Sequence, residues 1–262
     1  MKLDGCTALI TGASAGIGRE FARQLAGRAR ALVLVARRRE RLEELREELT
    51  ARDPKLHIYI HVADIAEPAA IEQLNGFLDA QQIAVDFLIN NAGIGDHGPF
   101  ATGDPKRLEA MLQLNVVALT KLTHRLLPSM ISRKRGAILN VSSSASFLPL
   151  PRMAVYAATK AYVTSFSEAL NAEVYKHGIS VSALCPGPVH TEFNELARRS
   201  DERGERAPEF TYVAVEEVVR LGLAGIERNK AVVVPGLAMK AVMLVARLTP
   251  MPLLRLALRA NA

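Results

Sequence analysis

Short runs of β-branched and apolar residues alternate along this chain with longer stretches of helical periodicity, and this alternation restricts the fold more than any other feature. Seven runs have the length and composition of strands: Thr7–Thr11, Ala31–Ala36, His57–Val62, Val85–Asn90, Ala137–Val141, Ser180–Leu184 and Ala231–Val234. Strands that are separated by helices need crossover connections, which are right-handed and join parallel strands. The sequence therefore predicts an α/β fold, with helices on both faces of a mainly parallel sheet and the ligand site at the carboxyl ends of the strands.

The chain of 262 residues is long enough for one large α/β domain or two small ones. It has neither a linker rich in Pro, Gly or Ser nor a repeat of fixed period, so we expect one domain, with residues 1–236 as its main part and residues 237–262 as an apolar, basic extension. Cys6 and Cys185 lie in apolar runs, as free thiols do in a reducing compartment, and no secretory signal precedes the first strand. We therefore expect a cytoplasmic protein.

The positive charge of the chain is concentrated near its C-terminus. The net charge is +6, yet residues 1–227 are neutral overall and residues 228–262 contain no acid. In the extension the bases lie among Leu, Met, Val and Ala, and Pro250 and Pro252 predict a break between two short helices. Two interpretations of residues 237–262 remain open: a helix pair that covers the chain's own pocket, or a peripheral contact with a membrane surface.

Several classes of function are not expected. Only 5% of the residues are aromatic and none is Trp, which argues against nucleic-acid binding. The six histidines and two cysteines form no Cys/His cluster, so no metal site is expected. The longest uncharged stretch of the extension, between Arg247 and Arg255, is too short to span a bilayer.

A glycine-rich segment, Thr11-Gly12-Ala13-Ser14-Ala15-Gly16-Ile17-Gly18, directly follows the first predicted strand and leads into a helical pattern at Arg19–Leu25. Glycines at such a turn let the backbone approach a pyrophosphate, which then lies on the free amides of the helix N-terminus. The spacing Gly-x3-Gly-x-Gly differs from the commonest dinucleotide fingerprint, so a tight turn without a ligand is the alternative.

Three arginines, Arg37-Arg38-Arg39, follow the second predicted strand. A site for NAD places an acid near this position to bind the ribose 2′-hydroxyl, but this chain has Ala36 and then the arginines. Cations at a helix N-terminus oppose the helix dipole, and a bound 2′-phosphate would relieve this repulsion. The pattern favours NADP(H) over NAD(H), with Arg37 as the leading phosphate ligand.

Tyr156 and Lys160 are four residues apart in a helical pattern and therefore share one face of the helix. A cation beside a phenol favours the phenolate, so we expect Lys160 to lower the pKa of Tyr156 and to make the side chain useful as an acid or base. The alternative is an ordinary surface pair on a helix.

Taken together, these motifs resemble the short-chain dehydrogenase/reductase family. The resemblance covers nearly the whole chain in order, through Thr11–Gly18, Asn90-Asn91-Ala92-Gly93, Asn115, Ser143, Tyr156-x3-Lys160 and Pro186-Gly187. It implies a Rossmann-type, doubly wound domain with a seven-stranded sheet. It also implies an NADP(H)-dependent carbonyl reductase or alcohol dehydrogenase. A non-catalytic NADP(H)-binding protein that senses redox state or docks a partner is the alternative function.

The resemblance assigns a role to each of four catalytic residues. Tyr156 would donate its proton to the substrate carbonyl oxygen, and Ser143 would hold that oxygen. Lys160 would lower the pKa of Tyr156 and bind the nicotinamide ribose. Asn115 would position a water molecule that links Lys160 to solvent.

The cofactor contacts that the resemblance implies come from every part of the predicted site. Asp64 is expected to contact the adenine, and its alternative role is to cap a helix before Glu67-Pro68. The implied contacts are Gly12, Ser14, Ala15, Gly16, Ile17, Gly18, Arg37, Arg38, Asp64, Ile65, Asn91, Ala92, Gly93, Tyr156, Lys160, Pro186, Gly187, Val189 and Thr191.

Phe147, Met153 and Phe193 are expected to line an apolar substrate pocket for a hydrophobic ketone, aldehyde or alcohol, and His97 is a further candidate. The charged segment from Pro186 to about Pro208 is expected to form a solvated lid. We also expect a homodimer or tetramer, with the dimer formed through long helices around Leu108–Met130 and Tyr156–Lys176.

Overall fold

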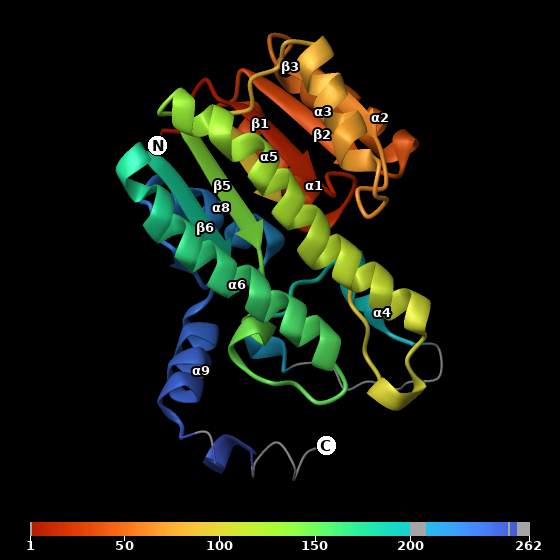
Figure 1. Ribbon diagram of the computed structural model, residues 1–262, viewed down its shortest axis with the longest axis vertical. Helices are drawn as coiled ribbons and strands as arrows, with labels where there is room; N and C mark the ends of the chain where they lie inside the picture. Colours follow the sequence, from red (N-terminus) through yellow and green to blue (C-terminus); the bar gives the residue numbers. More distant parts are fainter. Residues whose placement is uncertain (1, 200–207, 251, 256–262) are drawn as a thin grey trace.

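In a computed structural model, which describes residues 2–199, 208–250 and 252–255, seven parallel strands form one sheet in the order β3-β2-β1-β4-β5-β6-β7 (Figure 1). The strands are β1 (Thr7–Thr11), β2 (Ala31–Ala36), β3 (His57–Val62), β4 (Phe87–Asn90), β5 (Gly136–Val141), β6 (Ile179–Leu184) and β7 (Val232–Val233). The predicted fold class is confirmed, because all neighbouring strands pair in parallel. The strand order reverses between β1 and β4, where sheets of this type bind ligands.

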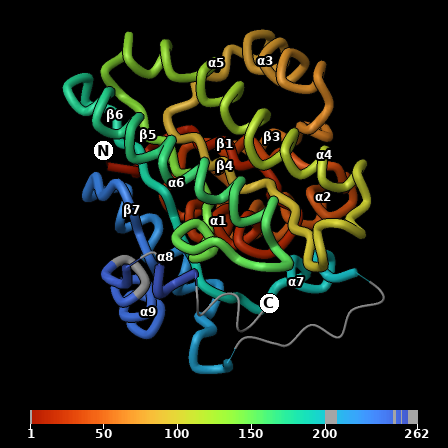
Figure 2. The backbone as a smooth tube through the Cα atoms, turned by 60° about the horizontal axis from the view of Figure 1, so that its bottom comes forward, coloured from red at the N-terminus to blue at the C-terminus, as the bar shows by residue number. Residues whose placement is uncertain are grey.

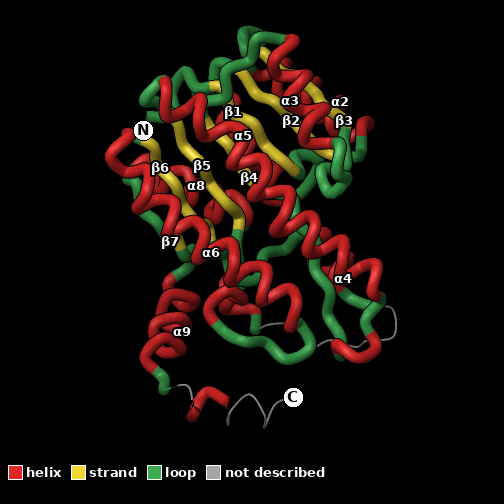
Figure 3. The backbone as a smooth tube through the Cα atoms, in the orientation of Figure 1, coloured by secondary structure: helices red, strands yellow, loops and turns green. Residues whose placement is uncertain are grey.

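Helices cover both faces of the sheet, as Figures 2 and 3 show. One face carries α1 (Gly16–Ala26), α2 (Arg39–Arg52) and α8 (Val215–Glu227); the other carries α3 (Ala70–Ala80), α5 (Leu119–Ser132) and α6 (Ala154–Val174). Three further helices complete this part of the fold: α4 (Pro105–Leu112), α7 (Glu192–Ala197) and α9 (Leu237–Leu248). Within the described ranges, no helix is both long and apolar enough to cross a bilayer.

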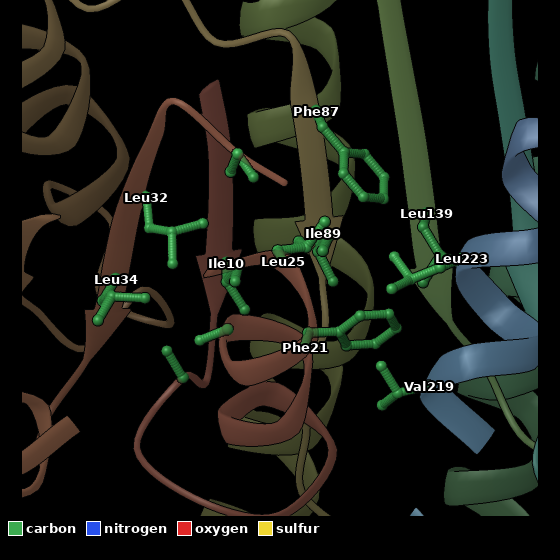
Figure 4. Packing of buried hydrophobic residues seen from close by; sticks show 14 of the residues in the cluster. Ile10, Phe21, Leu25, Leu32, Leu34, Phe87, Ile89, Leu139, Val219 and Leu223 are labelled. Atoms are coloured by element: carbon green, nitrogen blue, oxygen red, sulfur yellow. The ribbon is translucent and has the colours of Figure 1, made fainter. Parts of the chain in front are cut away.

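The core consists of two apolar layers because successive strand residues point to opposite faces. In β1, Ile10 packs on the side of α1 and α8, whereas Leu9 packs on the side of α3 and α5. Figure 4 shows the first of these layers, where Phe21 of α1 lies between Ile10 and Val219 of α8. Both faces of the sheet are therefore buried, which is why the strands appear in the sequence as continuous apolar runs.

The helix predicted around Leu108–Met130 is not continuous. A π-helical segment, η2 (Gln113–Ala118), separates α4 from α5 and contains Asn115, whose side chain is held by the loop after β4. The helix predicted around Tyr156–Lys176 ends at Val174 and is followed by the 3₁₀ turn η4 (Tyr175–His177). Gly178, with φ of 74°, then takes a left-handed conformation that stops the helix.

We expect Phe21→Ala to lower the free energy of unfolding by about 3–5 kcal/mol, because its fully buried ring fills the space between α1 and α8. Phe210→Ala is the matched control: this ring is 72% exposed, so its loss should change the free energy by less than about 0.5 kcal/mol. Urea unfolding followed by circular dichroism measures both. A similar loss in the two variants would contradict the packing described here.

Candidate active site

A cavity of about 710 Å³ opens at the carboxyl ends of the strands. It brings together residues that lie far apart in the sequence, from the turn after β1 to the segment after β6. Among the predicted site residues, those lining it are Gly12, Ser14, Ala15, Gly16, Ile17, Arg37, Arg38, Asp64, Ile65, Asn91, Ala92, Gly93, Ser143, Met153, Tyr156, Lys160, Pro186, Gly187, Val189, Thr191 and Phe193. Gly18, Asn115 and Phe147 are described but do not line this cavity.

The floor of the cavity depends on a close approach between the turn after β1 and the end of β4. Asn91 Nδ2 donates to the carbonyl oxygens of Thr11 at 2.9 Å and Gly12 at 3.2 Å. A Cβ atom at Gly18 would overlap both the Gly12 carbonyl and this amide, so Gly18 lets α1 pack against the turn. Its role is one of helix packing, in contrast to the cofactor contact implied for it.

Gly12 and Gly16 have positive φ angles of 67° and 50°, which glycine adopts without strain. A Cβ atom at Gly16 would come within 3.2 Å of Thr191, on the opposite wall of the cavity. The N-cap of α1, Ala15, makes no side-chain hydrogen bond to the helix, so no side chain competes for the first amides of α1 there. This arrangement suits an anionic group such as a pyrophosphate.

The predicted arginines lie at one end of the cavity. Arg37 Nη1 is 3.2 Å from Asp64 Oδ2, and its side chain is 69% exposed. Arg38 donates to Ser14 Oγ at 3.3 and 3.4 Å and pairs with Glu192 at 3.0 Å. Ser14, Arg37 and Arg38 therefore form a cluster of hydrogen-bond donors at this end.

Glu192, the first residue of α7, is a cavity residue that sequence reasoning missed as a site residue. Its carboxylate lies 2.6 Å from Arg41 Nη1 and 3.0 Å from Arg38 Nη1. Hydrogen bonds from Arg41 and Arg38 hold its pKa below the ordinary value for Glu. In the sequence Glu192 appears only as one charge of the solvated lid, since nothing local shows that it meets residues about 150 positions earlier.

Asp64 lies at the end of β3 and lines the cavity, as expected. Its Oδ1 accepts a hydrogen bond from the Ala66 amide at 3.1 Å, which stabilises a tight turn. The helix that follows begins only at Ala70, with Ala69 as its N-cap. The alternative role as a helix N-cap is therefore wrong.

Ser143, Tyr156 and Lys160 meet beside the end of β5. Ser143 lies two residues after the end of β5 and caps the 3₁₀ turn η3 (Ser144–Phe147), while Tyr156 and Lys160 lie in the first turns of α6. Tyr156 is hydrogen-bonded to Ser143. Lys160 Nζ lies 5.8 Å from the centre of the Tyr156 ring and donates to the Val141 carbonyl at 2.8 Å.

The expected lowering of the Tyr156 pKa by Lys160 is wrong, because burial has the larger effect on this phenol. Burial raises the pKa of Tyr156 to about 12, and the hydrogen bond with Ser143 opposes this only in part. Burial also lowers the pKa of Lys160 to about 8, so the ammonium group is itself easily deprotonated here. Around Tyr156 the cause is an apolar cluster, in which Met111 and Ala145 pack with the ring and exclude the water that would solvate a phenolate.

Asn115 lies behind the cavity wall instead of lining it. Its Oδ1 accepts a hydrogen bond from the Ile94 amide at 3.0 Å, and its Nδ2 donates to the Ile94 carbonyl at 2.9 Å. Nδ2 also donates to Thr159 Oγ1 at 3.1 Å. A Cβ atom at Gly93 would lie 3.1 Å from Asn115 Oδ1 and 3.4 Å from Lys160 Nζ. Asn115 therefore fixes the backbone beside Lys160, and Gly93 leaves room between them.

The other end of the cavity is apolar. Phe193 of α7 packs against the Tyr156 ring with centroids 5.6 Å apart, and Met153 belongs to the same cluster. Phe147, at the end of η3, does not line the cavity, whereas His97 does. Sequence reasoning missed five apolar or aromatic residues that line it from five separate segments: Ile94, Leu114, Leu150, Leu196 and Tyr212.

A buried acid, Asp96, joins two segments beside this apolar end, the loop after β4 and the residues after α7. Asp96, in the loop after β4, is 5% exposed and pairs with Arg199, which follows α7. Arg107 of α4 also pairs with Asp96, at 3.2 Å. The predicted lid is therefore tied to the loop after β4 through residue 199, and its residues 200–207 lie outside the described part of the chain.

We expect the stability of the cofactor-free protein to depend on pH through Lys160. Its pKa is about 8 in the folded protein and 10.5 for an ordinary lysine, so between these pH values the unfolded chain binds more protons at this position. The free energy of unfolding should therefore rise with pH, relative to that of Lys160→Met, by about 1 kcal/mol per pH unit.

Urea unfolding at several pH values between 8 and 10.5 measures this difference. Lys176→Met, at an exposed lysine, is the control and should keep the pH dependence of the parent protein. Parallel curves for the parent protein and Lys160→Met would contradict the effect of burial on Lys160.

Comparisons with known proteins agree with this geometry. A family described as short chain dehydrogenase matches residues 6–202. A very-long-chain 3-oxoacyl-CoA reductase from Anas platyrhynchos is 33% identical over 204 residues, covering 76% of this chain and 64% of that relative. The chain thus spans less than two thirds of the length of this relative.

Two solved structures are similar over almost their whole length. A short-chain dehydrogenase from Sphingobium yanoikuyae in complex with NADPH is 32% identical with a TM-score of 0.80, covering 98% of this chain and 96% of that one. A bulky-bulky ketone specific alcohol dehydrogenase from Comamonas testosteroni is 30% identical with a TM-score of 0.76, covering 94% and 95%. With its sheet order and the residues gathered at its cavity, the chain belongs to the short-chain dehydrogenase/reductase family of oxidoreductases.

Proposed function

We propose that this protein is an NADP(H)-dependent oxidoreductase that interconverts a hydrophobic ketone or aldehyde with its alcohol. The observation that carries the proposal is the position of Tyr156, Ser143 and Lys160 in one cavity, between an arginine-rich end and an apolar end. A proton donor, an oxygen-binding hydroxyl and a cation are the groups that carbonyl reduction needs beside the reacting carbon.

The residues at the arginine-rich end fit a dinucleotide with a 2′-phosphate. Gly12 and Gly16 leave the α1 N-terminus open to a pyrophosphate, and Ser14, Arg37 and Arg38 supply the donors that a phosphate monoester requires. Arg38 and Arg41 already hold an anion, the Glu192 carboxylate, which supports the affinity of this end for negative charge. Relatives of known cofactor include the Sphingobium enzyme in complex with NADPH.

In the proposed reaction, the nicotinamide supplies the hydride in carbonyl reduction and accepts it in alcohol oxidation. Ser143 and Tyr156 hold the substrate oxygen, and Tyr156 gives its phenolic proton to that oxygen as negative charge develops on it. A Tyr156 pKa of about 12 keeps the phenol protonated at neutral pH, which suits reduction. Lys160 anchors to the Val141 carbonyl and places its ammonium group beside the phenol, where it stabilises the phenolate left after transfer.

The apolar end favours a substrate with a sizeable hydrophobic group. Phe193, Met153, Leu150 and Ile94 surround Tyr156 and offer few polar partners to a substrate. A 3-oxoacyl thioester or a bulky ketone would place its carbonyl between Ser143 and Tyr156 and its apolar part against these side chains. The names of the two relatives, a 3-oxoacyl-CoA reductase and a bulky ketone alcohol dehydrogenase, agree with this class of substrate.

The alternative function, non-catalytic NADP(H) binding for redox sensing or partner docking, would require the cofactor site but not the groups around Tyr156. All four catalytic positions carry the residues that the family resemblance implies, and three of them line the cavity. An assay of NADPH oxidation over ketones, aldehydes and 3-oxoacyl thioesters separates the two functions, because a binding protein would turn over none of them.

Arg37→Ala should weaken the binding of NADPH by about tenfold to a hundredfold and leave the binding of NADH nearly unchanged, because only NADPH carries the phosphate that this guanidinium would bind. Arg39→Ala is the matched control, since this neighbouring arginine pairs with Glu43 and does not line the cavity. Fluorescence titration with both nucleotides measures the affinities. Equal affinity of the parent protein for NADH and NADPH would contradict the proposed preference.

Tyr156→Phe should remove nearly all turnover, by about a hundredfold or more, because it deletes the proton donor and keeps the ring against Phe193. Affinity for NADPH should stay within about threefold of the parent value, since the donors for the phosphates are untouched. Tyr162→Phe, at a partly exposed tyrosine of the same helix, is the control. Substantial activity of Tyr156→Phe on the best substrate would show that another group donates the proton.

A further inference from the structure

The largest concentration of exposed apolar side chains on the described part of the chain lies on and just after α9. Leu237, Leu244, Val245 and Leu248 are 83%, 60%, 65% and 74% exposed. At 100° per residue these four side chains fall within about 100° of one another around the helix axis, and we call them the α9 apolar face. Leu253, 59% exposed, extends the patch beyond the end of α9.

The opposite side of α9 already has its partner within the chain. Met239 and Met243 are 7% and 6% exposed, and α9 packs on the two 3₁₀ turns η3 and η5 (Glu209–Thr211). A Cβ atom at Gly187, a residue of the cavity wall, would come within 2.7 Å of Met239. The methionines therefore attach α9 to the wall of the cavity, and the α9 apolar face points away from the protein.

The charges of the C-terminal segment favour an anionic partner. Residues 228–262 contain no acid and six bases. Of these, Arg228 and Lys230 precede β7, whereas Lys240 and Arg247 belong to the sequence of α9 and Arg255 follows it. Lys240 is exposed and lies about 40° from Leu244 around the helix, at the border of the apolar face. An apolar stripe bordered by bases is the composition of a helix that lies in a membrane interface.

A second copy of the chain fits this face less well. In a two-fold contact the same patch meets itself, which brings the basic C-terminal segments of the two copies close together. That segment has no acid, and Glu209 of η5, on which α9 packs, already contacts His190 at 3.1 Å. Anionic phospholipid headgroups supply that negative charge, and the acyl boundary accepts the four side chains.

We propose that the α9 apolar face lies on an anionic phospholipid surface, with the ammonium group of Lys240 at the headgroups. In Figure 1, α9 lies beyond the end of the sheet at which the strands finish and the cavity opens. If the proposed function holds, this contact would bring the apolar end of the cavity close to a membrane, from which a lipid-like carbonyl compound could enter.

Flotation of the full chain with lipid vesicles tests this contact. We expect binding to vesicles of phosphatidylcholine with about 30% phosphatidylglycerol, and at least about tenfold weaker binding to phosphatidylcholine alone or at about 500 mM instead of 50 mM salt. Leu244→Ser combined with Leu248→Ser should weaken binding by about tenfold or more. Phe100→Ser combined with Leu112→Ser, two exposed apolar residues elsewhere, should bind as the parent protein does.

No binding to the anionic vesicles at low salt, or equal binding by the Leu244/Leu248 variant, would overturn the proposal. Sedimentation of the parent protein and this variant without lipid identifies the competing occupant: a parent dimer that the two serines dissociate would make the α9 apolar face a contact between copies and would also overturn it. NADPH titration of the same variant keeps the two proposals separate. Cofactor binding without vesicle binding rejects only the membrane contact.

Discussion

The cavity exists because α1 and the end of β4 both contact the turn after β1, and this close approach requires a glycine at position 18. Gly18 leaves no Cβ between α1 and the Gly12 carbonyl, so Asn91 can bond the backbone of the turn directly. Thr11 stabilises the same contact, since its hydroxyl oxygen accepts hydrogen bonds from the backbone amides of Asn91 and Ala92, each at 3.0 Å. The two halves of the sheet are joined here, and the open helix N-terminus faces the space above the junction.

Burial governs the chemistry of the neighbouring groups more strongly than their mutual attraction does. Burial in the apolar cluster that shapes the substrate end raises the pKa of Tyr156, and burial beside it lowers the pKa of Lys160, so both shifts favour the neutral forms. A negative charge on a bound dinucleotide or on a substrate oxygen would favour the protonated form of Lys160. The protonation states of this site therefore depend on the charges of the ligands that it binds.

The strands and most cavity residues could be predicted from the sequence, because they depend on local patterns. Each predicted strand end falls within two residues of its observed position, since strands buried on both faces form apolar runs bounded by polar turns. The position of Phe147 could not be predicted, because it depends on which way η3 turns after β5. Glu192 and the π-helical segment were likewise missed, as each is determined by partners distant in the chain, Arg38 and Arg41 in one case and the backbone of Ile94 in the other.

The π-helical segment η2 also fixes the length of the chain between α4 and α5. A π turn holds one residue more than an α turn, so η2 absorbs an extra residue while α4 and α5 keep nearly the phase of one continuous helix. The wide turn lets the side chain of Asn115 reach the backbone of Ile94. Deleting one residue of Gln113–Ala118 would convert η2 into an α turn and leave Arg107 of α4 facing Asp96, but it would withdraw Asn115 from Ile94. Such a deletion would loosen the loop after β4 beside Lys160, so an alignment of related chains that keep this arrangement should show no gap across η2.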